Sequence, residues 1–146
     1  IIENIRNINS IPLSIDDSLK VEVELEGVLY TPFCNSTISI DQLLSNSFSK
    51  VDNSTSILFK AFQIFCSKSD ELSDLTQLQK WGFEVPITLR TDDPKQVKRW
   101  HSQWIKNELF SNLPTNGIVA KCNSSLTKNF LGASPSSPNW ALALTR

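Results

Sequence analysis

The sequence of 146 residues has no methionine, one histidine and only four glycines. Any histidine-based catalytic centre would therefore depend on His101. The glycines are Gly27, Gly82, Gly117 and Gly132, and no two lie within ten residues of each other. Walker and dinucleotide-binding loops need closely spaced glycines where the backbone approaches a phosphate, so the sequence excludes both.

Other absences in the sequence bear on the cellular location of the protein and on whether the chain is a domain of a larger one. No stretch approaches the ~18 apolar residues that a membrane-spanning helix needs, and no secretory signal opens the sequence. We therefore expect no membrane partner. Because Ile1 stands first and methionine is absent throughout, we expect the chain to be a domain of a larger protein or complex subunit.

Cysteine is scarce and irregularly placed, at Cys34, Cys66 and Cys122. An odd number at wide spacing argues against a disulfide framework and favours free thiols in a reducing compartment, nuclear or cytoplasmic. With no C-x₂-C pair, no second histidine and no D-x-D-x-D loop, the sequence predicts no bound metal. We also expect no cofactor.

Three N-x-S/T sequences, at Asn35, Asn53 and Asn123, point to a different compartment. They would suit a secreted, glycosylated domain. The chain is so rich in Asn, Ser and Thr that chance alone gives about two to three such sequences. The secreted domain stays an alternative to an intracellular one.

The clearest strand pattern covers residues 19–30. Its glutamates, Glu22, Glu24 and Glu26, alternate with apolar residues, which is the period of a half-buried strand. The pattern predicts an acidic strip on one face, as either a solvated surface or a docking strip for a basic partner. Gly27 then predicts a bulge or turn.

The clearest helix pattern begins at Asp93, which can cap the helix, with Pro94 at its first position. This helix is expected to reach residues 109–111. Its basic residues, Lys95, Arg99 and Lys106, share the face opposite Trp100, His101 and Trp104. We interpret the tryptophan side as the core and His101 as a locally hydrogen-bonded residue, and the basic side as a solvated face or a binding surface.

The remaining pattern predicts helices at 39–50, 70–81 and within 123–138, and strands at 84–91, 117–122 and 140–144. Residues 57–66 fit a helix or a buried strand equally. This order predicts the α+β class, as one domain over residues 19–146 with a mixed or antiparallel sheet and about three helices on one face. Residues 1–18 are expected to form an N-terminal tether.

Charge is divided unevenly along the chain. Residues 1–79 hold 5 basic and 11 acidic residues, and residues 80–146 hold 9 and 4. Such asymmetry suggests charged partners. Because no known catalytic motif is present, the sequence predicts a non-catalytic protein–protein interaction module that uses the acidic strip and the basic helix face. The alternatives are a nucleic-acid-binding domain using the helix at 94–110, and an enzyme working through carboxylates or a cysteine.

Overall fold

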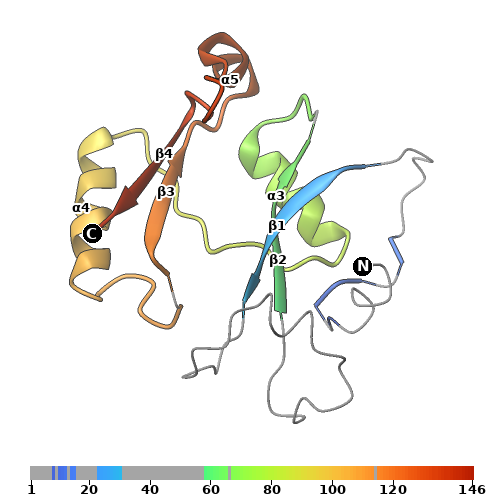
Figure 1. The fold of residues 1–146 in the computed structure, drawn as a ribbon, viewed down its shortest axis with the longest axis horizontal. Coiled ribbons are helices and arrows are strands. Elements are labelled where there is room, and N and C mark those ends of the chain that lie inside the picture. The colour runs from blue at the N-terminus through green and yellow to red at the C-terminus, as the bar shows by residue number, and fades with distance from the viewer. Residues whose placement is uncertain are drawn as a thin grey trace. The chain divides into compact units, whose positions relative to one another are not determined.

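The computed structural model describes residues 8, 10–12, 14–15, 23–30, 58–65, 67–113 and 115–146 (Figure 1). Within this part the chain forms, in order, β1 (Leu25–Tyr30), β2 (Leu58–Ile64), α3 (Glu71–Lys80), α4 (Pro94–Ile105), β3 (Gly117–Lys121), α5 (Ser125–Leu131) and β4 (Ala141–Thr145). The residues group into two compact units: the first holds 1–67 and 73–86, the second 68–72 and 87–146.

The first unit contains an antiparallel pair of β1 and β2. The register shifts after Glu26, where Gly27 faces Ala61 and leaves Phe62 as the extra residue. The predicted bulge is therefore confirmed. A Cβ atom at Gly27 would collide with the ring of Phe59 and with a backbone carbonyl of β2, so only glycine fits there.

The buried apolar side chains of the first unit come from α3, β2 and neighbouring segments, and Ile8 packs against Ile11, Leu29 and Phe59. Leu75 and Leu78 of α3 are buried at a three-residue spacing, the separation that places side chains on one helix face. Ala61 is fully buried, and Phe59 meets Phe83 edge to face at 6.2 Å between ring centroids. Within the ambiguous segment 57–66, residues Leu58–Ile64 form a strand, β2.

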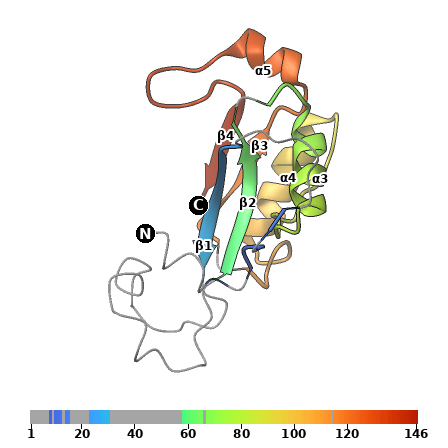
Figure 2. The same cartoon turned by 90° about the vertical axis from the view of Figure 1, so that its right-hand side faces the viewer.

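The second unit pairs β3 with β4 in antiparallel fashion, and α4 lies alongside this pair (Figures 1 and 2). The Asp93 carboxylate accepts the amide of Lys95 at 2.8 Å, so the predicted cap is confirmed. The helix ends at Ile105, earlier than expected. Asn107 adopts a positive φ of 61°, a left-handed conformation that an α-helix cannot continue through.

The strand expected at 84–91 is wrong. Only Glu84 forms a bridge, parallel to Lys60, and residues 85–90 have no regular structure. Ile87 and Leu89 are exposed, so their alternation with polar residues does not reflect a buried sheet face. Pro86 lacks the amide that would continue pairing beyond the bridge.

The predicted α+β class, with three helices and antiparallel pairing, is confirmed over the described residues. The helix expected at 39–50, two sequons and two of the cysteines lie outside the described residues. The tether at 1–18 and the single domain at 19–146 stay predictions. None of the described helices has the length and apolar character needed to cross a membrane.

Candidate nucleic-acid interface

The basic residues predicted on α4 are all exposed. Arg99 pairs with the capping Asp93 at 3.3 Å, and both side chains are at least half exposed. Within the described part of the chain, no carboxylate lies within ion-pair distance of the ammonium groups of Lys95, Lys98 or Lys106. This α4 basic face, defined as Lys95, Lys98, Arg99 and Lys106, therefore has charge to offer a partner.

The opposite side of α4 is fixed by Trp104. Its ring is buried, and its Nε1–H donates to Thr115 Oγ1 at 2.8 Å. His101 stacks on Trp104 at 6.0 Å and is hydrogen-bonded through Nε2 to the Thr145 carbonyl at 2.9 Å. The Arg146 guanidinium lies 5.5 Å from the Trp104 ring centroid. These contacts hold α4 in one rotational setting, with its basic face turned outward.

The acidic strip belongs to the first unit. Glu26 lies on β1 and Glu24 just before it, and both are exposed. Glu22 lies outside the described residues. The prediction that the strip binds a partner is not tested by this placement.

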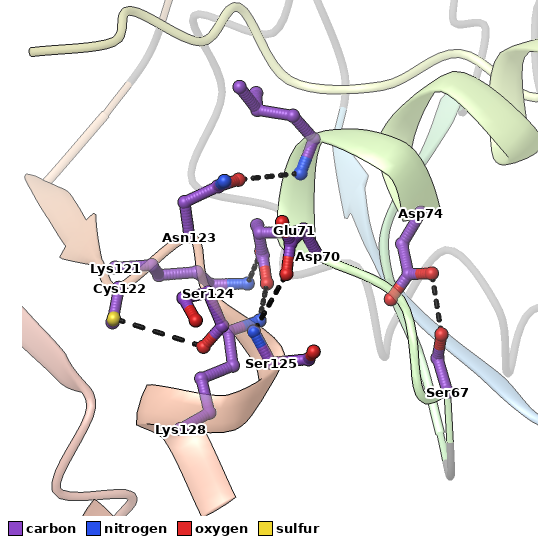
Figure 3. Close-up of polar contacts among 11 residues, drawn as sticks. Ser67, Asp70, Glu71, Asp74, Lys121, Cys122, Asn123, Ser124, Ser125 and Lys128 are labelled. Carbon is purple, nitrogen blue, oxygen red and sulfur yellow. Dashed lines mark hydrogen bonds and ion pairs between the residues drawn. The ribbon is translucent and has the colours of Figure 1, made fainter.

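A cluster that the sequence patterns did not indicate lies in the second unit, around Glu71 (Figure 3). One carboxylate oxygen accepts from Lys121 Nζ at 2.6 Å, and the other accepts from Lys128 Nζ. The side chains of Glu71, Lys121 and Lys128 are only 12%, 20% and 15% exposed. We call these three residues and Trp140 the Glu71 cluster.

Trp140 contributes an aromatic face to this cluster. The Lys128 ammonium lies 4.7 Å from its ring centroid and the Lys121 ammonium 5.9 Å. Two ammonium groups share one carboxylate, so the cluster carries one excess positive charge. A half-buried positive charge of this kind interacts more strongly with an anion than an exposed one does.

Backbone hydrogen bonds position the Glu71 cluster. Asn123 accepts the Glu71 amide through its backbone carbonyl at 2.9 Å and the Leu72 amide through its side-chain oxygen at 3.0 Å. Asp70 accepts the Ser125 amide at 2.9 Å, at the start of α5 (Figure 3). Lys121 and Lys128 are 50 and 57 residues from Glu71 in sequence. No local pattern could have found this cluster.

The two units differ in charge. Residues 68–72 and 87–146 contain nine basic and five acidic residues, giving +4. The first unit contains five and ten, giving −5. Both the α4 basic face and the Glu71 cluster belong to the positive unit, which is the sign that a nucleic-acid interface requires.

The known proteins that this chain resembles are DNA ligases, which agrees with the positive charge of the second unit. In an alignment of 163 residues, gaps included, the chain is 24% identical to a DNA ligase of Cytophaga hutchinsonii. In an alignment of 160 residues it is 25% identical to a DNA ligase of Mycoplasma genitalium. These alignments cover 96% and 98% of this chain. A DNA ligase of Ehrlichia chaffeensis is 34% identical over 79 residues, 53% of the chain. No protein-family model matches.

The chain spans about a quarter of the length of the Cytophaga and Mycoplasma proteins, 24% in each case. Similarity to DNA ligases over almost the whole chain nevertheless contradicts three predictions. The non-catalytic protein–protein module is wrong, since these relatives are enzymes. The exclusion of an enzyme is wrong for the same reason. The choice of another protein as main partner is wrong because the names of these relatives imply DNA. The nuclear location has no support, and the nucleic-acid alternative fits better.

Proposed function

We propose that this chain is part of a DNA-joining enzyme, and that its second unit contacts the DNA. The observation that carries the proposal is the similarity to DNA ligases over 96–98% of the chain. The charge of +4 on the second unit supports it, because duplex DNA carries a dense row of phosphates. An intracellular location follows from a DNA substrate.

The α4 basic face has dimensions suited to a phosphate backbone. At ~1.5 Å per residue, Lys95 and Lys106 lie about 16 Å apart along the helix direction. One DNA strand carries about five phosphates over that length. Three or four exposed cations in such a row can each neutralise a phosphate, which positions the protein on the duplex without reading its sequence.

The Glu71 cluster can add a held cation to this interface. Exposed lysines lose side-chain freedom when they contact a phosphate, but Lys121 and Lys128 are already ordered by Glu71 and Trp140. A phosphate that approaches the cluster would meet its one excess charge at little further entropic cost. We assign the α4 basic face the larger share of binding, because its side chains are exposed.

A salt titration tests this proposal. Binding of the whole chain to a fluorescent nicked duplex should weaken steeply with salt, with a slope of log K against log [salt] of about −3 if three phosphates are contacted. The variant Lys95→Glu/Arg99→Glu/Lys106→Glu should lose most binding and most of the slope. No binding of the wild-type chain near 50 mM salt would refute the proposal.

Single charge reversals provide a matched control. Lys95→Glu and Lys106→Glu should each reduce the magnitude of the slope by about one or more, because each removes a phosphate contact. Lys80→Glu changes an exposed lysine of the first unit by the same charge. Its slope should stay close to wild type. Equal losses from all three substitutions would show that net charge alone, rather than the α4 basic face, drives binding.

A further inference from the structure

Helix α5 presents apolar side chains outward. Phe130 is 88% exposed and Leu126 is 80% exposed. Four residues apart on a helix, they lie on the same face, about 6 Å apart along the axis. Surface helices normally bury their apolar face, so two large apolar side chains in this position need a reason.

The orientation of α5 is fixed by polar contacts at several points. Ser124 caps its first turn by accepting the Thr127 amide at 3.3 Å, and Asp70 accepts the amide of Ser125. Lys128 turns inward and pairs with Glu71. At the other end, the Asn139 side chain donates to the Leu131 carbonyl at 2.9 Å. Because Lys128 is held on the inner side, α5 cannot rotate to bury Leu126 and Phe130.

We propose that Leu126 and Phe130 form a wedge that stacks against DNA bases at an interruption in one strand. This proposal rests on the proposed function and specifies how the second unit would contact a break in one DNA strand. Phenylalanine and leucine are among the side chains that DNA-binding proteins insert between base steps. Opening a stack costs least where the strand is already interrupted, so a nick or gap favours insertion.

Charge selects DNA bases over a protein groove as the occupant. The exposed residues of α5 and of the segment 132–138 that follows it carry no charge. The unit as a whole carries +4, so an anionic polymer is attracted to it while its uncharged base faces match the wedge. The ~6 Å between the two side chains is close to the separation of two successive base steps, at 3.4 Å each.

The test compares Phe130→Ala and Leu126→Ala with Asn129→Ala, which removes an exposed polar side chain from the same helix. The probe is a duplex with 2-aminopurine beside a nick or a one-nucleotide gap. The wild-type chain should change the fluorescence of the interrupted duplex and leave an intact duplex unaffected. Phe130→Ala should abolish this change and weaken binding to the gapped duplex about tenfold. Asn129→Ala should match wild type.

The readouts separate this proposal from the proposed function. Phe130 stacks and makes no ionic contact, so Phe130→Ala should leave the salt slope unchanged. Normal DNA binding with the same fluorescence and affinity for Phe130→Ala would overturn the wedge and leave the proposed function intact. Absence of DNA binding by the wild-type chain would overturn the proposed function, and the wedge with it. Loss of binding to a protein partner by Phe130→Ala, with DNA affinity and fluorescence unchanged, would also overturn the wedge and would indicate that Phe130 fits a groove on that protein.

Discussion

Replacing Glu71 by glutamine should destabilise the second unit more than removing one of its lysines. Glu71→Gln keeps the shape of the side chain but removes the charge that both Lys121 and Lys128 share. The two ammonium groups would then lose the carboxylate that they share, while both stay largely buried. The reverse change, Lys128→Met, leaves a balanced pair of Glu71 and Lys121.

The expected loss in free energy of unfolding follows from how deeply the side chains of the cluster are buried. Removing one partner of a fully buried ion pair costs roughly 3–5 kcal/mol. The three side chains here are 12–20% exposed, so water partly compensates, and we expect Glu71→Gln to lower the free energy of unfolding by about 2–3 kcal/mol. Lys128→Met loses an ion pair and the contact with Trp140, for about 1 kcal/mol.

Urea denaturation followed by tryptophan fluorescence and circular dichroism would measure both variants against wild type. The diagnostic result is which variant is destabilised more, because that order depends on the excess positive charge of the Glu71 cluster. High salt should reduce the difference between the variants by screening the two ammonium groups. A cost of Glu71→Gln no larger than that of Lys128→Met would refute the idea of a charge-imbalanced cluster.

Three further predictions concern the fold. Asp93→Ala should cost about 1 kcal/mol in urea denaturation by removing the cap of α4, whereas Asp93→Asn should retain most of it. Burial raises the pKa of Tyr30, and the nearby Glu84 carboxylate raises it further. Tyr30 is the only tyrosine, so a phenolate absorbance titration should show a midpoint above 10.0 that falls in Glu84→Gln. The folded state should lose stability as pH rises past the unfolded pKa, because the unfolded phenol ionises first. Gly27→Ala should cost about 1–3 kcal/mol by forcing a Cβ atom against Phe59, measured by thermal denaturation. A stable Gly27→Ala variant would contradict the close packing at the bulge.

Elements with strong local signals were predictable. Alternation predicted a strand over residues 19–30, of which Leu25–Tyr30 form β1, while Val23 and Glu24 lie outside the strand. The absence of a side chain at Gly27 allowed the bulge, and the Asp93–Pro94 pair located the start of α4. Each depends on residues within a few positions of each other. The end of α4 was placed too late: Asn107 is a residue type that tolerates the left-handed conformation ending a helix, but the apolar residues at 109–110 extended the predicted period beyond it.

Features that depend on distant partners escaped prediction. Residues 84–91 have strand-like composition, but within this segment only Glu84 forms a β-bridge, to Lys60. The Glu71 cluster joins residues at least 50 positions apart. The exposed wedge on α5 reverses the usual rule that apolar residues face inward, because Lys128 has its partner on the inner side.

The error about function has a related cause. Catalytic residues that lie far apart in sequence form no local motif, so the absence of such motifs does not exclude an enzyme. The surface that supports the present proposal, the α4 basic face, was identified from its spacing, and similarity to DNA ligases then changed its expected partner from protein to DNA.

The most direct test of the central claim is a nick-joining assay with the full-length protein that carries this chain. A labelled nicked duplex, a divalent cation and a panel of nucleotide energy donors would be supplied, and joined product followed on a denaturing gel. Joined product is expected with at least one donor. The joining rate of Lys95→Glu/Arg99→Glu/Lys106→Glu should be at least tenfold lower at moderate salt, and that of Lys80→Glu should stay near wild type. No joined product with any donor from the wild-type protein would contradict the central claim.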